Sequence, residues 1–288
     1  MLFPLSSIFR DLPELKLLDI GASPIDGDPP YKNVFDLGKA DLVGFEPDPV
    51  QLQALLDMEL PRATFLPLAL GQGGPAELKI CHSPGMTSLL EPDPEILSNF
   101  HGFSEWGRVV QRKVLETHRL DDVEQARGSD YLKIDVQGGE LAIFEAGKQV
   151  LQGLSVVHTE VQFVPFYKDQ PLFAELDQVL RQAGFFFHRF LPIHGRVFKP
   201  MMINEDPYAG LSQELWSDAV YVRRFTDFAE LPVSQLLKIA ILLNDLYESV
   251  DLASLALQHA DARAGTKRQE RYIQALQHPS LFSTPSST

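Results

Sequence analysis

Cysteine is nearly absent from this sequence, and long apolar runs are absent altogether. Cys81 is the only cysteine, so the chain cannot form an intramolecular disulfide or a cysteine metal cluster. No stretch is apolar over the roughly 20 residues that span a bilayer. The apolar start, residues 1–12, is interrupted by Arg10 and Asp11, which argues against a signal peptide. We therefore expect a cytoplasmic protein of bacterial type with no membrane span.

Positive charge is also scarce, because 25 Lys and Arg residues stand against 39 Asp and Glu and the net charge is −14. An acidic chain is poorly suited to follow nucleic-acid phosphates or to bind an anionic membrane surface, so we expect neither partner. The hydrophobic fraction of 44% and the charged fraction of 22% are typical of a globular protein. At 288 residues, the chain can form one large α/β domain with appendages, or two small domains.

Residues 15–23, Leu-Lys-Leu-Leu-Asp-Ile-Gly-Ala-Ser, read as a buried strand followed by small residues. The apolar run suits a strand that is covered on both faces of a parallel sheet. Asp19 supplies a carboxylate, and Gly21 lets a ligand approach the backbone. Ligands of doubly wound sheets bind beyond the carboxyl ends of the strands. The stretch therefore predicts the floor of a cofactor site, although a tight strand-to-helix turn without a ligand would look much the same.

A second strand, predicted over residues 41–46, also ends in an acidic residue. Nucleoside-binding folds place a carboxylate there, where both ribose hydroxyls can donate to it. Glu46 lies 27 positions after Asp19, close to the spacing expected for that role. Asp48 predicts the N-cap of the next helix, with Pro49 at its first position. Since Asp48 already fills the capping role, we predict that Glu46 binds ribose.

Residues 131–140, Tyr-Leu-Lys-Ile-Asp-Val-Gln-Gly-Gly-Glu, repeat the order of strand, carboxylate and glycines. Asp135 would then lie at the carboxyl edge of the fourth strand, beside the first. The fifth strand is predicted over residues 154–161. Side chains two positions apart point to the same face of a strand, so His158 and Glu160 should share one face.

The remaining segments complete an alternation of strands and helices. They are a helix over 31–37, a strand over 63–70, strands over 75–81 and 109–114, a helix over 140–150, a helix capped by Asp169 or Gln170 with Pro171 in its first turn, and an antiparallel pair over 185–187 and 218–225. Pro67 places the third strand at a sheet edge, and the irregular stretch 82–105 is typical of a lid or substrate wall. Two apolar helical stripes after residue 233 predict a helical hairpin that packs on the body or forms an oligomer contact. Residues 280–288 are expected to be disordered.

Six motifs in order resemble the FkbM-type family of S-adenosylmethionine-dependent methyltransferases, with matching spacing over roughly residues 15–190. They are Leu-Asp-Ile-Gly-Ala, Gly-Phe-Glu-Pro-Asp, Leu-Ala-Leu-Gly, Thr-Ser-Leu-Leu-Glu-Pro, Arg-Leu-Asp-Asp and Leu-Lys-Ile-Asp-Val-Gln-Gly-Gly-Glu. The resemblance implies an α/β fold: a Rossmann-like class I methyltransferase sheet in the order 3-2-1-4-5-7-6, with a C-terminal helical extension. The implied division is a methyltransferase domain over 1–230, the extension over 231–278 and a tail over 279–288.

The resemblance also implies O-methylation of a small-molecule or glycan hydroxyl, on a sugar or a polyketide-type natural product. In that case Asp19 and Gly21 would line the methionine end of S-adenosylmethionine, Glu46 would hold its ribose, and Leu68 and Ala69 would flank its adenine. The residues expected to bind the cofactor are Asp19, Gly21, Ala22, Glu46, Asp48, Leu68, Ala69 and Asp135.

Methylation of a hydroxyl requires a proton acceptor, and the candidate catalytic residues are Asp135, His158 and Glu160. Asp135 is favoured because glycines and a helix start frame it, whereas a single histidine such as His158 is more often a core residue. Ser88 and His82 could face the acceptor, or could be plain loop surface. No two histidines lie one helical turn apart in a metal-binding pattern, so we predict no required metal.

The sequence departs from the family pattern at two places. Ser23 and Pro24 replace the common Asn and second Gly, and Gln137 stands where many members carry Glu.

Two other classes of function remain open. A nicotinamide-dependent oxidoreductase is disfavoured because Gly-x-Gly-x-x-Gly does not follow Asp19. A catalytically idle adaptor would bind a partner through the C-terminal helices, with a cofactor pocket that has decayed or that binds the cofactor without turnover. The same helices are also candidates for homo-oligomer contacts.

Overall fold

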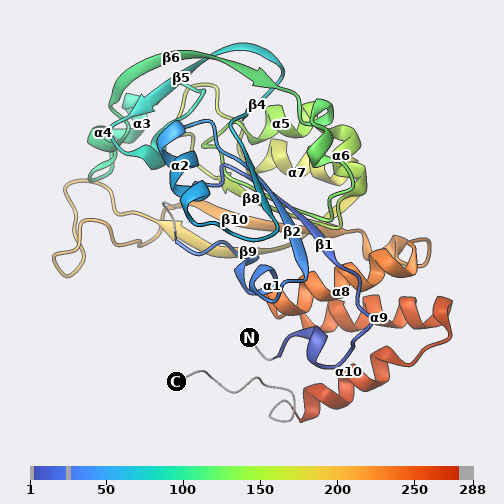
Figure 1. The fold of residues 1–288 in the computed structure, drawn as a ribbon. Coiled ribbons are helices and arrows are strands. Elements are labelled where there is room, and N and C mark those ends of the chain that lie inside the picture. Colours follow the sequence, from blue (N-terminus) through green and yellow to red (C-terminus); the bar gives the residue numbers. More distant parts are fainter. Residues whose placement is uncertain (1–2, 24–26, 279–288) are drawn as a thin grey trace.

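A seven-stranded sheet forms the centre of the computed structural model, which describes residues 3–23 and 27–278 (Figure 1). Its strands follow the order β3-β2-β1-β7-β8-β10-β9. They are β1 Leu15–Ile20, β2 Ala40–Phe45, β3 Ala63–Leu66, β7 Tyr131–Ile134, β8 Val156–Gln162, β9 Phe185–Gly195 and β10 Glu214–Arg223. The first five in the sheet order are parallel, and β10 is antiparallel to both β8 and β9. The expected class I methyltransferase order is confirmed.

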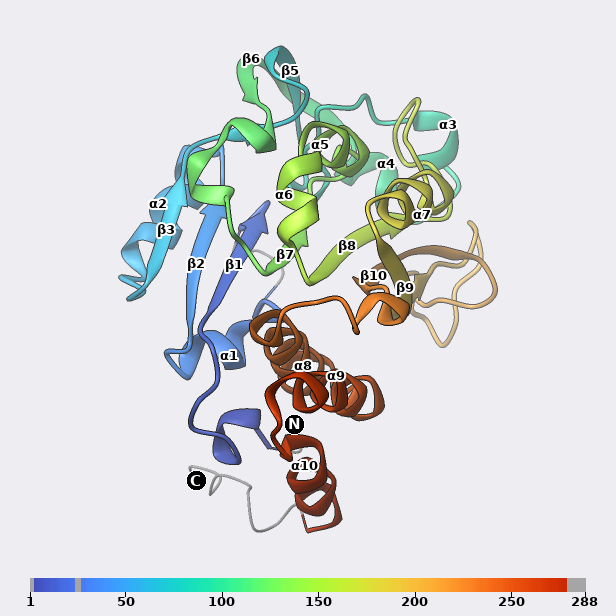
Figure 2. The ribbon, with the colours of Figure 1, turned by 90° about the vertical axis from the view of Figure 1, so that its right-hand side faces the viewer.

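A smaller three-stranded sheet lies over the carboxyl ends of the parallel strands (Figures 1 and 2). It consists of β4 Ala69–Leu70, β6 Val109–His118 and β5 Gly74–Cys81. The helices are α1 Lys32–Asp36, α2 Pro49–Asp57, α3 Pro94–Leu97, α4 Phe103–Trp106, α5 Glu140–Ala146, α6 Lys148–Gly153, α7 Phe173–Gln182, α8 Val233–Tyr247, α9 Val250–Ala264 and α10 Arg268–Gln277. No helix in the described ranges is both long and apolar enough to cross a membrane.

The strand expected over residues 63–70 is divided at Pro67. Its first part, β3, pairs with β2 at the edge of the large sheet, and its second part, β4, pairs with β6 in the small sheet. Proline has no backbone N–H and cannot continue a hydrogen-bonded ladder, so the chain leaves the sheet there. The edge position was therefore predicted correctly, while a single continuous strand was wrong.

Helix boundaries were also predicted incompletely. The helix expected over 140–150 is interrupted at Gly147, where a Cβ would lie 2.7 Å from the Leu120 side chain. The helix expected to be capped by Asp169 or Gln170 begins at Phe173 instead, with Leu172 as its N-cap. The stretch 82–105 contains the short helices α3 and α4. The tail over residues 280–288 lies outside the described part of the chain.

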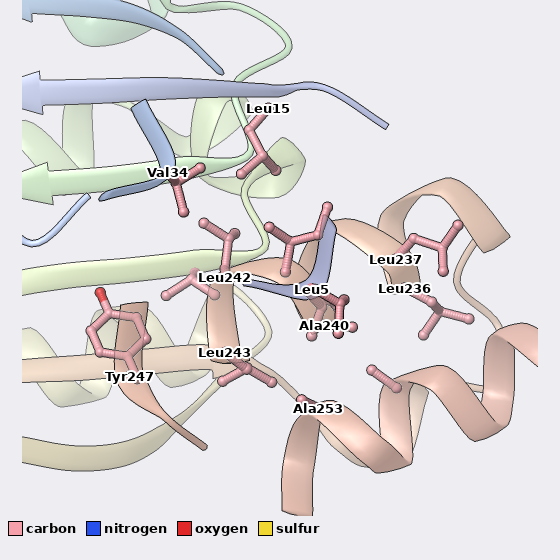
Figure 3. Close-up of a cluster of buried hydrophobic side chains, with 14 of the residues drawn as sticks. Leu5, Leu15, Val34, Leu236, Leu237, Ala240, Leu242, Leu243, Tyr247 and Ala253 are labelled. Atoms are coloured by element: carbon pink, nitrogen blue, oxygen red, sulfur yellow. The ribbon is translucent and has the colours of Figure 1, made fainter. Parts of the chain in front are cut away.

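Both faces of the large sheet are covered by helices. One face, here called the α5 face, packs against α5, α6 and α7; its buried residues include Leu18, Ile20, Leu132, Val157 and Tyr221. The other, here called the α8 face, packs against α1, α8 and α9. Figure 3 shows residues of the α8 face, including Leu5, Leu15, Val34, Leu242 and Leu243. Each such buried side chain contributes about 1.5–3 kcal/mol.

The C-terminal helices therefore pack on the body, which was one of the two arrangements expected for them. The N-terminal segment is tied to the same helices, because Asp245 accepts a hydrogen bond from the backbone N–H of Leu5 at 2.9 Å. The side-chain amide of Asn244 donates to the carbonyl of Phe3 at 2.9 Å. The first and last parts of the described chain thus complete one core (Figure 3).

Arg223 on β10 joins the helices of the α5 face to the sheet, and its loss should destabilise the fold. Its guanidinium donates to the carbonyls of Leu154 at 2.6 Å, Ala183 at 2.7 Å and Leu151. We expect Arg223→Met to lower the free energy of unfolding by about 3 kcal/mol in urea titrations, because carbonyls that the guanidinium satisfies lose their donor. The exposed neighbour Arg224, which pairs with Asp227 at 2.8 Å, is the control. Arg224→Met should change the free energy of unfolding by less than about 0.5 kcal/mol. Equal losses of stability in the two variants would refute the prediction.

Candidate cofactor and acceptor site

A cavity of about 390 Å³ lies beyond the carboxyl ends of β1, β2 and β7. It sits where the strand order reverses between β1 and β7, the position at which doubly wound sheets bind ligands. Strands β5 and β6 and the loop that follows β5 cover it. Residues that were predicted to bind a cofactor and that line the cavity are Gly21, Glu46, Asp48, Leu68, Ala69 and Asp135.

Gly21 is required at the floor of this cavity. It adopts a φ of +77°, and a Cβ at this position would lie 2.0 Å from the carbonyl oxygen of Asp135. Any side chain would therefore push β1 and β7 apart, besides being strained by the positive φ. The backbone N–H of Gly21 also donates to the carbonyl of Phe45 at 3.1 Å. The ends of three neighbouring strands thus meet at one glycine.

Glu46 presents a carboxylate to the cavity although the side chain is largely buried. It is 6% exposed, and its Oε1 accepts a hydrogen bond from the backbone N–H of Asp48 at 2.7 Å. Burial, followed by the negative charges of Asp48 and Asp19, raises the pKa of Glu46 to about 6. Asp48 itself caps α2 through Oδ1, as predicted, and accepts from the N–H groups of Val50 and Gln51.

Asp19 and Ala22 are not among the described residues that line the cavity. Asp19 precedes the lining residues Ile20 and Gly21, is 3% exposed, and accepts a hydrogen bond from the hydroxyl of Tyr31 at 2.5 Å. The ammonium of Lys133 lies 3.6 Å from the other oxygen of Asp19 and donates to the carbonyl of Gly21 at 3.2 Å. Asp19 therefore supports the loop after β1. Sequence reasoning missed both partners of Asp19. Tyr31 belongs to no motif, and Lys133 lies within the motif Leu-Lys-Ile-Asp-Val-Gln-Gly-Gly-Glu, which does not indicate that its side chain reaches Asp19.

Two further carboxyl groups gather next to Asp135. Oxygen atoms of Asp135, Glu140 and Glu160 all lie within 4.8 Å of one another. Burial, then the charge of Asp135, holds the pKa of Glu160 well above its usual range. Burial also raises the pKa of Glu140 to about 7, and Oε1 of Glu140 accepts from the N–H of Val136 at 2.8 Å. The absence of a required metal stays a prediction.

His158 shares the α8 face with Glu160, but it lies away from the cavity. It is 4% exposed and is not among the described lining residues. Its Nδ1 lies 3.1 Å from the hydroxyl of Tyr247 on α8, and its Nε2 lies 3.4 Å from Asp218. These contacts are those of a packed core histidine. Of the two loop candidates, Ser88 lines the cavity, whereas half-exposed His82 lies 3.6 Å from Glu105 at the surface.

Comparison with known proteins places these residues within a described family. The family model of the methyltransferase FkbM domain matches residues 19–187. No curated protein matches the chain in sequence.

Several solved structures are similar to the chain at low sequence identity, and two of them serve as examples. One is precorrin-6y C5,15-methyltransferase from Geobacter metallireducens, with 13% identity, coverage of 76% of this chain and 85% of that chain, and a TM-score of 0.35. The other is magnesium protoporphyrin IX methyltransferase from Synechocystis with bound S-adenosylmethionine, with 11% identity, coverage of 74% and 72%, and a TM-score of 0.36. The similarity is too distant to carry either acceptor over to this chain.

Burial of Glu46 should make it a destabilising residue at neutral pH. The pKa of this carboxyl group is ordinarily 4.5, and it is about 6 in the folded protein. The folded state therefore binds the proton more tightly than the unfolded state, which stabilises the fold at low pH. This stabilisation is lost as the pH rises through 6. As the pH rises from about 5 to about 8, the free energy of unfolding of the wild type should fall by about 1 kcal/mol relative to that of Glu46→Gln in urea titrations. This figure allows for the partial exposure of the side chain. Exposed Glu124→Gln is the control, and parallel pH curves for wild type and Glu46→Gln would contradict the prediction.

Proposed function

We propose that this chain, which belongs to the FkbM methyltransferase family, transfers the methyl group of S-adenosylmethionine to a hydroxyl oxygen of a sugar, glycan or polyketide-type acceptor. The family membership rests on the match over residues 19–187. The observation that most supports the roles proposed here is that Glu46 and Asp135, which come from different strands, line one cavity on either side of Gly21.

The lining residues fit S-adenosylmethionine by their chemistry. The buried carboxylate of Glu46 can accept hydrogen bonds from both ribose hydroxyls. Leu68 and Ala69 offer apolar surface for the adenine, and both line the cavity because the chain leaves the large sheet at Pro67. Gly21 leaves its backbone open to the methionine end. Asp19 would act from below by holding the loop, since Tyr31 and Lys133 fix its carboxylate.

The bound cofactor supplies an electrophilic methyl group on a positively charged sulfur. The chain has two tasks in its transfer: to hold the acceptor oxygen in line with that methyl carbon, and to accept the proton that the hydroxyl loses. Asp135 is the proposed proton acceptor, because it lines the cavity and comes directly after β7. Glu160 is buried behind it, and His158 faces α8, so neither is the first choice.

Cofactor binding should depend on Glu46 and on pH. We expect Glu46→Ala to weaken the binding of S-adenosylhomocysteine at least about tenfold in calorimetric titrations, because hydrogen bonds to a charged group are lost. Wild-type affinity should fall as the pH drops through about 6, the pKa of Glu46, since a protonated carboxyl cannot accept from both hydroxyls. The affinity of Glu46→Gln should vary less over the same range. Folded wild type that binds neither this compound nor S-adenosylmethionine would favour the adaptor.

Catalysis should depend on Asp135. In a screen of hydroxylated acceptors that detects S-adenosylhomocysteine release, Asp135→Asn should lower kcat by about 10²–10⁴, the usual contribution of a general base. The affinity for S-adenosylhomocysteine should change far less, because the asparagine keeps the shape of the side chain. Unaltered kcat in this variant would exclude Asp135 as the proton acceptor and direct attention to Glu160.

A further inference from the structure

Gln137 links two carboxylates that belong to neighbouring strands. Its side-chain nitrogen lies 2.8 Å from Oδ1 of Asp135 and 3.1 Å from Oε2 of Glu160. An amide NH₂ group has two hydrogens, so one nitrogen can donate to both oxygens at once. The backbone of Gln137 has a φ of +57°, a conformation uncommon for a residue with a side chain. The chain therefore turns sharply after β7 at the residue that makes this bridge.

The orientation of the amide follows from its neighbours. Oxygen and nitrogen of an amide are assigned from the hydrogen-bond network, and an amide oxygen in the bridging position would face Oδ1 of the Asp135 carboxylate at 2.8 Å without a donor between them. The hydroxyl of Tyr167 lies 3.3 Å from the amide oxygen, and it also lies 3.1 Å from the carbonyl of Met86. Ser88 donates to the backbone carbonyl of Gln137 at 2.6 Å. The residue is thus held from both sides.

The two carboxyl groups need such a bridge because like charges at short range repel each other. The charged groups that face Glu160 are Asp135, Glu140, Asp218 and Lys133, and the ammonium of Lys133 also lies 3.6 Å from Asp19. A neutral amide can separate the carboxylates and satisfy one oxygen of each without adding charge. Gln162 gives a second hydrogen bond to Oε2 of Glu160 at 2.6 Å, but no hydrogen bond joins it to Asp135 in the described part of the structure.

We propose that Gln137 is a positioning residue for methyl transfer: its amide holds Oδ1 of Asp135, keeps this carboxylate apart from Glu160 and leaves Oδ2 for the proton of the acceptor hydroxyl. This inference rests on the proposed role of Asp135. It assigns to Gln137, which itself lines the cavity, the task of positioning the base. Since Ser88 also lines the cavity and bonds to Gln137, the covering loop and the base are joined through the same residue.

The test compares Gln137→Met, which keeps the length and loses the donors, with Gln162→Met, which removes the amide that contacts Glu160 alone. Carboxyl-carbon NMR titrations of the cofactor-free proteins follow the resonances of Asp135 and Glu160. In Gln137→Met the titration of Asp135 should move to higher pH by about one unit, because hydrogen bonds to a carboxylate favour its ionised form. In Gln162→Met, the titration of the Asp135 resonance should occur at the same pH as in the wild type. Glutamate is nearly identical in shape to glutamine, and Gln137→Glu should move the titration of Asp135 in the same direction, because it adds a like charge. This variant replaces Gln137→Met if Gln137→Met fails to fold.

The kinetic readout distinguishes positioning from a general loss of stability. We expect kcat of Gln137→Met to fall about tenfold to a hundredfold, the loss typical of a hydrogen bond to a charged group, with KM for S-adenosylmethionine little changed. The acidic limb of its pH profile should move upward with the NMR titration. An unmoved Asp135 resonance in a folded Gln137 variant would overturn the proposal. If the resonance moves but Asp135→Asn remains fully active, the bridge is real and the proposed role of Asp135 is wrong.

Discussion

The close approach of β1 and β7 at Gly21 is the constraint on which the site depends. The backbone carbonyl of Asp135 occupies the space that a side chain at position 21 would need. This contact fixes the distance between the loop after β1 and the loop after β7. It also brings the residues expected to hold a cofactor and the residue expected to accept a proton into one cavity. A substitution here would alter both loops together, because neither can move without the other.

Around this contact the fold places carboxylates where water is scarce, and it stabilises them one by one. Asp19 has Tyr31 and Lys133, Glu140 has the N–H of Val136, and Asp135 and Glu160 share the amide of Gln137. Unpaired buried charges would be costly. Each of these carboxyl groups is therefore held by a hydrogen-bond donor or a cation, and Asp135 and Glu160 share one donor.

Much of this arrangement could be predicted from residues 15–162. Apolar strands that end in an acidic residue and alternate with helices indicate a parallel sheet and the edge of the sheet at which a ligand binds. Glu46 and Asp135 were predicted at that edge in this way, and both line the cavity. The partners of the acids could not be found, since Tyr31 and Lys133 reach Asp19 through tertiary packing that leaves no periodic pattern. His158 shows the same limit: the alternation placed it on the face of Glu160, while its burial against Tyr247 depends on a helix 89 positions later. Pro67 lies inside the strand expected over 63–70, and Gly147 lies inside the helix expected over 140–150. Residue preferences alone did not determine whether either residue would divide its element or only bend it.

The packing of α8 on β1 has a consequence for how the chain folds during synthesis. Leu15 and Leu17 leave the ribosome early, but much of the surface that buries them, on α8 and α9, follows more than 200 residues later. The α5 face can close sooner, because α5, α6 and α7 are complete at Gln182, before α8 begins at Val233. Domains generally fold as units while they are synthesised, and apolar surface that waits for its partner is prone to aggregation. One side of the sheet therefore stays open until the last helices emerge, and a nascent chain at that stage is a natural client for a chaperone.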